Sequence, residues 1–269
     1  MKSPQKRLTI ECDNLAAFLA VPPRACAPEH RSSETGKAEF TGTRSYAETV
    51  ALMKQGWPEG AALARALSAS LTAGLAEADA THRPGPVWDV AGDDVDVDRY
   101  LAGEPESMVA WEPDVVPAAG RVVRLVLAGR VAFHVGESAM RTAAVMTAAA
   151  ADVLEARGVR AEIVVAYAVE FAGRVFEIRH RLKAAEEPLD LPRVVAGMHP
   201  SAFRRVVFRW METQPDLPGG YGTCAKIGTA EGDVVLEIER LSSIREADRP
   251  AWLRKQAEEV FGITDGVPV

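Results

Sequence analysis

An uncharged helix between two apolar strands limits the fold of this chain more than any other feature. Ten consecutive residues, 142–151, carry no charge inside a predicted helix that runs from Ser138 to about Arg157. A helix without a polar face needs cover on most of its circumference, so it must lie between other layers. The aliphatic run Val122–Ala128 precedes it and the run 159–169 follows it, and both are typical of interior strands. This order predicts an α/β fold.

Further elements extend this order toward the end of the chain. Residues 175–183 alternate apolar and charged side chains, which predicts a strand at the sheet edge or with one exposed face. A tight turn at 171–174 joins this strand to the preceding one, which predicts a hairpin. A helix from Ser201, a strand over 234–240 and a last helix capped by Asp248 follow.

Residues 1–117 predict a helical or irregular N-terminal portion, distinct from the α/β portion over 118–269. Ser45 and Glu48 are spaced as a capping box, in which each side chain accepts a hydrogen bond from the other residue's backbone amide. Gly56 then ends that helix.

An acidic segment over 87–117 closes the N-terminal portion. Nine carboxylates stand against Arg99 alone, so the segment carries a net charge of −8 in a chain whose overall charge is −7. We expect an acidic turn in which Asp96 or Asp98 caps a short helix that Gly103 stops. The candidate protein-binding residues of this segment are Asp93, Asp94, Asp96, Asp98, Arg99 and Tyr100.

The alternating aspartates of this segment resemble a calcium loop, but two essential positions differ. With Asp94 as position 1, position 6 is Arg99 instead of the glycine that makes the sharp turn, and position 12 is Pro105 instead of glutamate. We therefore expect no bound metal at the segment.

A serine hydrolase site is the one catalytic arrangement that the residues suggest. Residues 136–140 resemble the nucleophile elbow Gly-x-Ser-x-Gly without its last glycine, with Ser138 as the nucleophile. Asp190 and His199 follow in the chain order of a triad, but they stand only nine positions apart. Ser138 as a helix cap explains the same residue with fewer assumptions, so we predict no catalytic residue.

The histidines and cysteines predict neither a metal site nor a disulfide framework. The five histidines show no metal-ligand spacing, and His180 lies on the apolar face of its strand, where we expect a hydrogen-bonded core imidazole. Cys12, Cys26 and Cys224 are few, odd in number and widely spaced, which favours the reducing cytoplasm. Apolar runs stay well short of the roughly 18 residues of a membrane helix. We expect a cytoplasmic protein without a membrane span or a cofactor.

Two other stretches are candidate binding surfaces. Residues 174–209 hold eight basic side chains against four carboxylates, and this net charge of +4 could contact RNA phosphates, although a solvated charged face is the simpler interpretation. The glycine-rich run 219–222 leads toward a strand rather than a helix, which favours a tight connection over a phosphate loop. The basic-edge candidates are Arg179, Arg181, Arg204 and Arg205, and the sheet-edge loop candidates are Gly220, Tyr221 and Lys226.

The portion over 118–269 resembles a von Willebrand factor A domain. The matching features are the first strand Val122–Ala128, the buried helix from Ser138, and a hairpin inside an otherwise alternating α/β order. The phrases FTGTRSYAETVALMKQGWPEG (40–60) and DVDVDRYLAGEPESM (94–108) are also similar to an uncharacterised family of bacterial and phage proteins that carry such a domain. The resemblance implies a three-layer fold around a mixed sheet.

The resemblance also implies how such a domain works here. Metal-binding domains of this type carry Asp-x-Ser-x-Ser at the end of the first strand, whereas this strand runs into Leu127, Ala128, Gly129 and Arg130. We therefore expect a metal-independent, non-catalytic binding or adaptor module of a bacterial or phage assembly. Its partner would be a protein, and the resemblance suggests an AAA+ ATPase. Two alternatives stay open: an RNA-associated protein that uses 174–209, and a serine hydrolase.

Overall fold

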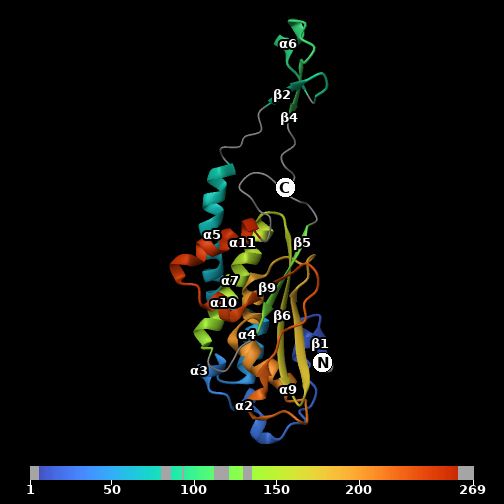
Figure 1. Cartoon of the computed structure of the whole chain (residues 1–269). Helices are drawn as coiled ribbons and strands as arrows, with labels where there is room; N and C mark the ends of the chain where they lie inside the picture. Colours follow the sequence, from blue (N-terminus) through green and yellow to red (C-terminus); the bar gives the residue numbers. More distant parts are fainter. Residues whose placement is uncertain (1–5, 80–85, 93, 112–120, 130–134, 260–269) are drawn as a thin grey trace.

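The structure is a computed structural model that describes residues 6–79, 86–92, 94–111, 121–129 and 135–259. Helices and a mixed sheet form one body from 6–79 and 121–259, and residues 86–111 form a small unit of their own (Figure 1). Figure 1 shows this small unit at the top, beyond the end of helix α5 (Pro58–Asp79).

The main sheet has the strand order β1-β7-β6-β5-β9, with the short β8 pairing to β6 outside this path. Its strands are β1 (Lys6–Cys12), β5 (Val122–Ala128), β6 (Arg160–Phe171), β7 (Arg174–Lys183), β8 (Thr223–Cys224) and β9 (Asp233–Glu237). β5 runs parallel to both β6 and β9, β6 and β7 are antiparallel, and β1 runs parallel to β7. The expected α/β architecture with a mixed sheet is confirmed.

The hairpin predicted at 171–174 is present. β6 and β7 are joined by Ala172 and Gly173, whose φ angles of 48° and 71° lie in the left-handed region. This backbone matches the twist of the two strands, and it is easily adopted by glycine. The turn therefore sets the register that pairs Tyr167 with Ile178.

The helices of the body gather on one face of the sheet (Figure 1). They are α1 (Leu15–Leu19), α2 (Ser32–Thr35), α3 (Ala38–Thr41), α4 (Tyr46–Gln55), α5, α7 (Glu137–Ala156), α8 (Leu191–Gly197), the π-helix over Ala202–Val207 with its continuation α9 (Phe208–Met211), α10 (Ile238–Ser242) and α11 (Arg249–Glu259). Short 3-10 turns cover Pro28–His30, Gly219–Tyr221 and Glu246–Asp248.

Helix α7 lies between the sheet and an outer layer of helices. It contacts β5 and β6 on one side and α5, α10 and α11 on the other. Its uncharged stretch is buried, with Ala143, Ala144 and Met146 fully inaccessible to solvent. The prediction of a helix between layers is confirmed, and the α7 side chains form the centre of the core.

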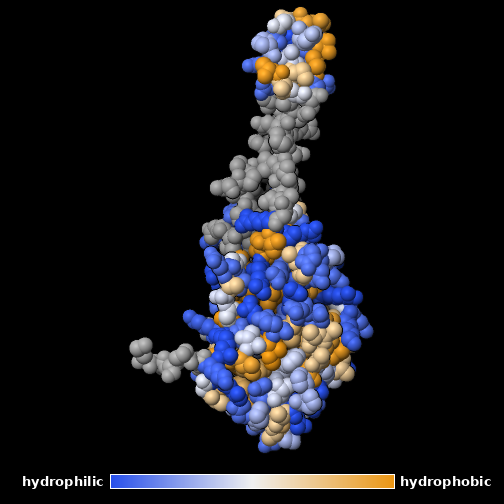
Figure 2. All heavy atoms as spheres, turned by 90° about the vertical axis from the view of Figure 1, so that its right-hand side faces the viewer, coloured by the Kyte–Doolittle hydropathy of each residue, from blue (hydrophilic) through white to orange (hydrophobic). Residues whose placement is uncertain are grey.

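The other face of the sheet carries charged side chains under a crossing segment. We call residues 225–232 the strap: Ile227 packs on the small cluster of Val126, Val164 and Ala166. The backbone N–H of Gly228 donates to both carboxylate oxygens of Glu177 at 3.1 and 3.0 Å. Figure 2 views the molecule from this side. In the expected three-layer fold, a second layer of helices would cover this face of the sheet. Among the described residues, the strap covers it instead.

The N-terminal portion needs a correction, because it is not only helical or irregular. Residues 6–12 form β1, which pairs in parallel with β7. Phe18, Met53 and Trp57 lie in the same core as the α7 and β5 side chains, so most of the N-terminal portion belongs to the body. Leu8, Ile10 and Cys12 alternate with polar residues along β1, but the strand lies at the edge of the sheet and its partner β7 is far along the chain.

Two further expectations about elements are wrong. β7 was expected at the sheet edge or with one exposed face, but β1 forms the edge and most side chains on both faces of β7 are buried. Helix α7 begins at Glu137 with Gly136 as its N-cap and without a side-chain cap bond, so Ser138 lies in the first turn and is not the cap. By contrast, Ser45 caps α4 as expected, accepting from Glu48 N at 3.1 Å, while the Glu48 carboxylate accepts from Arg44 N.

The small unit is a three-stranded antiparallel sheet with one short helix. It consists of β2 (Pro86–Asp89), β3 (Asp94–Val95), α6 (Val97–Leu101) and β4 (Met108–Trp111), in the sheet order β2-β4-β3. β4 pairs with both neighbours, and α6 lies in the connection between β3 and β4. This unit occupies most of the acidic segment.

Candidate functional site

The small unit exposes more large apolar side chains than its size explains. Six of the ten exposed large apolar residues among the described ones belong to it. They are Trp88, Val90, Val95, Val97, Tyr100 and Leu101. The two most exposed, Val90 and Leu101, are 69% and 77% accessible. Figure 2 shows hydrophobic orange beside hydrophilic blue on the small unit at the top of the molecule. Apolar patches on soluble proteins often mark interaction sites.

A network around Asp96 orders the short helix that carries three of these side chains. Asp96 is the N-cap of α6 and accepts from Arg99 N at 3.2 Å. Its second carboxylate oxygen accepts from Trp88 Nε1 at 2.9 Å, and this bond lowers the pKa of Asp96 below its ordinary value. Asp96 N donates to Ser107 O at 2.8 Å. The predicted capping by an aspartate is confirmed, and the cap joins α6 to β2 and to the chain before β4.

Arg99 is used within the small unit. Its guanidinium lies over the Trp88 ring, 4.7 Å from the centroid, and pairs with Glu104 at 3.0 Å. It also donates to the carbonyl of Glu106 at 3.2 Å. The single cation of the acidic segment therefore holds the unit together, and the unit exposes Tyr100 and Leu101 within a segment rich in carboxylates.

A scan against protein-family models matches residues 2–264 to a domain of unknown function, DUF7192. The chain belongs to this family. The matched residues include both the body and the small unit. Searches of curated proteins and of solved structures found no significant match.

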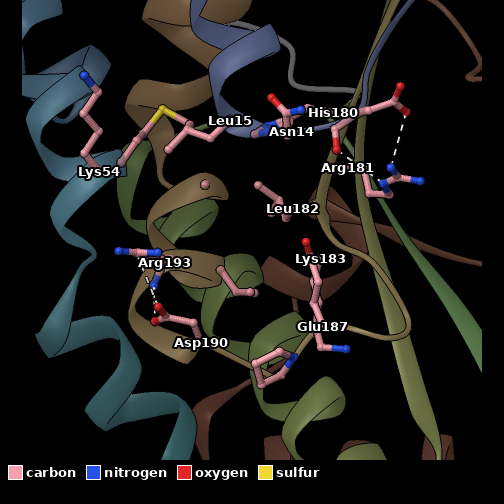
Figure 3. Close-up of a pocket in the computed structure, with 15 residues that line it drawn as sticks. Asn14, Leu15, Lys54, His180, Arg181, Leu182, Lys183, Glu187, Asp190 and Arg193 are labelled. Carbon is pink, nitrogen blue, oxygen red and sulfur yellow. Dashed lines mark hydrogen bonds and ion pairs between the residues drawn. The ribbon is translucent and has the colours of Figure 1, made fainter.

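In this DUF7192 chain, a cavity of about 640 Å³ opens on the body between the end of β7, α4 and α8 (Figure 3). Most of its charged side chains are engaged in pairs. Arg181 pairs with Asp13 at 3.6 Å, and Arg193 pairs with Asp190 at 3.3 Å. The buried Lys183 donates to Ala161 O at 2.7 Å and pairs with a carboxylate of α7. The cavity offers mixed apolar and paired polar walls rather than a concentrated reactive group.

His180 lines this cavity and is 2% accessible. Its ring stacks on Phe18 with a centroid distance of 4.1 Å, and neither ring nitrogen has a hydrogen-bond partner among the described residues. Burial lowers the pKa of His180 to about 3, so the ring is neutral at physiological pH. The expected core position is confirmed, but the expectation of a hydrogen-bonded imidazole is wrong.

The basic-edge candidates do not form one exposed stripe. Arg205 is fully buried and Arg204 is 3% accessible, because both lie on the π-helix that faces the core. Both donate to backbone carbonyls, as in the bonds from Arg204 to Val135 O and from Arg205 to Thr43 O. Arg179 is 9% accessible beneath the strap, and only Arg181 is substantially exposed. An exposed arginine stripe is therefore corrected to a set of mostly structural arginines.

The loop candidates lie in two different places. Tyr221 is buried, and its hydroxyl donates to Glu212 Oε1 at 2.6 Å while it accepts from Ser32 N at 2.7 Å. Gly220 is exposed beside it with a φ of 80°. Lys226 is exposed on the strap, and its carbonyl accepts from Arg7. Tyr221 is thus a structural residue, whereas Lys226 presents its side chain to solvent.

The hydrolase arrangement is not assembled. His199 shares a hydrogen bond of 2.8 Å with Ser201, not with Ser138, and packs edge-on against Trp57. Asp190 caps α8 and pairs with Arg193. These bonds give both proposed triad partners structural roles.

The remaining expectations concern absences or a residue outside the described ranges. The candidate Asp93 lies outside the described residues. Within the described ranges, no group of histidine, cysteine and carboxylate side chains has the arrangement of a metal site. The described helices include none with the length and hydropathy of a membrane span. In the part of the chain that the structure describes, Cys12, Cys26 and Cys224 form no disulfide.

Proposed function

We propose that this DUF7192 protein is a non-catalytic protein-binding module whose small unit docks onto a basic partner. The observation that carries the proposal is the cluster of exposed apolar side chains on an ordered acidic unit. Tyr100 and Leu101 are 66% and 77% accessible at the end of α6, which the Asp96 cap holds in place. Tyrosine and neighbouring apolar side chains are frequent anchors of protein interfaces.

The charge of the acidic segment supports the choice of partner. A net charge of −8 over 87–117 repels acidic surfaces and attracts basic ones, which speeds encounter and orients the complex. The exposed apolar side chains would then provide the affinity, because they are already exposed in the free protein. The partner should therefore present an apolar groove bordered by lysine or arginine.

We infer further that the body is von Willebrand factor A-like and that it binds its partner without a metal. The sheet order β7-β6-β5-β9, with β7 antiparallel, supports a von Willebrand factor A-like body. A strand that ends in Leu127 and Ala128, without carboxylate or hydroxyl, supports metal-independent binding. A cytoplasmic bacterial or phage setting and an AAA+ ATPase as the partner rest on the resemblance alone. Burial of Arg204 and Arg205 removes the support for RNA binding, and the bonds of His199 do the same for the hydrolase.

A comparison of three full-length proteins tests the proposal. The wild type, a double variant Tyr100→Ser/Leu101→Ser, and Leu63→Ser are each used to capture proteins from an extract. Leu63 is the matched control, because it is an apolar side chain of α5 that is 58% accessible on the body. We expect one basic partner in equal amount to the wild type and to Leu63→Ser, and its loss from the double variant.

The salt dependence gives a second readout. Because charge steers the encounter, the captured partner should be released more readily as the ionic strength rises from about 50 to 300 mM. A partner that stays bound to the double variant would contradict the assignment of the small unit. Capture of RNA in place of a protein would instead favour the RNA-binding alternative, which the burial of Arg204 and Arg205 disfavours.

A further inference from the structure

A second cavity, of about 390 Å³, lies where the chain after α1 passes α9. Three of its six lining residues are arginines: Arg24, Arg31 and Arg209. The others, Val21, Pro22 and Pro23, form an apolar wall in which proline fixes the backbone. No carboxylate is among the lining residues.

Arg209 is held in place but has free hydrogen-bonding capacity. Its guanidinium lies 4.2 Å from the centroid of the Tyr46 ring, which positions it by a cation–π contact. Its one ion pair, with Glu34, is at 4.0 Å, and its guanidinium makes no hydrogen bond within the described residues. Arg205, one turn earlier, differs: it donates to Ser33 O at 2.9 Å, Gly36 O at 3.0 Å and Thr43 O at 2.6 Å. Arg209 is therefore not needed to satisfy the fold.

Arg24 and Arg31 also retain unused donors. An arginine has five N–H donors. The guanidinium of Arg31 donates to Cys26 O at 3.3 Å, and its Nε has no hydrogen-bond partner in the described chain. Arg24 pairs with Glu34 at 2.8 Å and lies 3.6 Å from Glu212, which leaves its Nη1 without a hydrogen bond. The three guanidinium groups come from three chain segments. Together they have more N–H donors than the described chain has acceptors around them.

The backbone around the arginines is anchored before any ligand arrives. The carbonyl of Glu212 accepts from Ala25 N at 2.9 Å and from Cys26 N at 3.1 Å. The fully buried carboxylate of Glu212 accepts from Ser33 N at 2.9 Å. The segments that carry Arg24 and Arg31 are therefore both tied to the end of α9. Three arginines against Glu34 and Glu212 leave a surplus of one positive charge.

We propose that this cavity binds the phosphoryl group of a small phosphate monoester. Arginines from several directions suit a tetrahedral group with three acceptor oxygens, whereas a planar carboxylate is satisfied by one guanidinium fork. The volume is near the lower end of small-molecule sites, which span about 300–1,000 Å³. The wall of Val21, Pro22 and Pro23 provides an apolar surface for the carbon part of the ester. The inference is independent of the docking of the small unit, because the cavity lies on the body.

Thermal unfolding of the full chain with inorganic phosphate or glycerol 3-phosphate tests the site, with sodium chloride at matched ionic strength as the reference. We expect both probes to raise Tm in a saturable way, with the ester acting at lower concentration. Arg209→Gln removes donors that the fold does not use, and it should weaken the apparent affinity by about 10- to 100-fold. Arg193→Gln is the matched control, because Arg193 is 67% accessible and lies at the other cavity.

Three outcomes would overturn the proposal. One is a wild-type response no larger than that to sodium chloride, and another is an equal response in Arg209→Gln. A response to inorganic phosphate alone would overturn the monoester assignment. Arg31→Gln is a second, independent variant. It removes another arginine of the cavity at the cost of one hydrogen bond, to Cys26 O, and it should also weaken the Tm response to the phosphate probes. Capture of a protein partner by the small unit does not enter any of these readouts.

Discussion

The buried side chains of Arg205 and His180 differ in whether their nitrogens have hydrogen-bond partners. Arg205 is fully buried and its donors reach a hydroxyl and several carbonyls of residues 33–43. His180 is 2% accessible and both its nitrogens lack partners among the described residues. A buried polar atom without a partner destabilises the folded state by about 1–3 kcal/mol. The sequence places His180 on an apolar face and Arg205 among the exposed basic candidates, but it does not show which of them finds partners, because those partners lie far away in the chain.

Replacing His180 by Phe should change the pH dependence of stability. The pKa of His180 is about 3 in the folded state, below its ordinary value of 6.5. Between these values the unfolded chain binds a proton that the folded protein does not, so stability falls as the pH falls. His180→Phe should reduce this slope by up to about 1.4 kcal/mol per pH unit. At pH 7 the variant should be at least as stable as the wild type, because Phe can still stack on Phe18.

Urea unfolding at pH 7.5 and at pH 5 measures this effect directly. Some slope should remain, because burial also lowers the pKa of His199 to about 3. An unchanged difference between the two pH values, or a loss of several kcal/mol at pH 7.5, would contradict the interpretation of His180 as an unpaired core ring.

At the scale of elements, the sequence correctly predicted those features that neighbouring residues determine. The cap at Ser45, an aspartate cap at Asp96 and the buried helix α7 follow from neighbouring residues, and each is present. β1 was not predicted, although Leu8, Ile10 and Cys12 alternate along it, because a seven-residue strand is a short signal and its pairing with β7 joins residues about 170 positions apart in the chain. The small sheet was missed because its strands have two to four residues. In the candidate site, the sequence indicated a binding surface by its carboxylates, whereas the apolar residues between them indicate that surface more clearly.

The strap explains why the charged side chains of β7 are mostly buried, although their alternation with apolar residues predicts an exposed face. Glu177 is 1% accessible because Gly228, which lies 51 positions later, covers it, and Arg7 and Arg179 pair with it. Glu177→Gln keeps the shape but removes the negative charge between two arginines. Breaking a buried pair on one side destabilises proteins by about 3–5 kcal/mol. We expect a loss near 3 kcal/mol in urea unfolding and faster trypsin cleavage after Lys226, which lies on the strap.

A matched carboxylate of the small unit is the control for this variant. Glu104 pairs with Arg99 at 3.0 Å but is 49% accessible, so Glu104→Gln should change stability by less than about 1 kcal/mol. Equal cleavage after Lys226 in the wild type and in Glu177→Gln would show that Glu177 does not hold the strap.

At the scale of the whole molecule, the body and the small unit are separable by their contacts. The hydrophobic core of the described chain contains no residue of 86–111. α5 ends at Asp79 and β5 begins at Val122, so one insertion point leaves every strand of the main sheet intact. Replacing 80–120 by a Gly/Ser linker of about 15 residues, with a mean reach near 20 Å, should therefore leave the body folded. We expect Tm within about 3 °C of that of the wild type.

The shortened protein also separates the two proposed activities. Partner capture should disappear with the small unit, because Tyr100 and Leu101 are removed. The response to glycerol 3-phosphate should persist, because Arg24, Arg31 and Arg209 all belong to the body. Loss of cooperative unfolding would show instead that the unit stabilises the core, and continued partner capture would move the docking surface to the body. A folded body that keeps phosphate binding and loses its partner would assign one activity to each part of the chain.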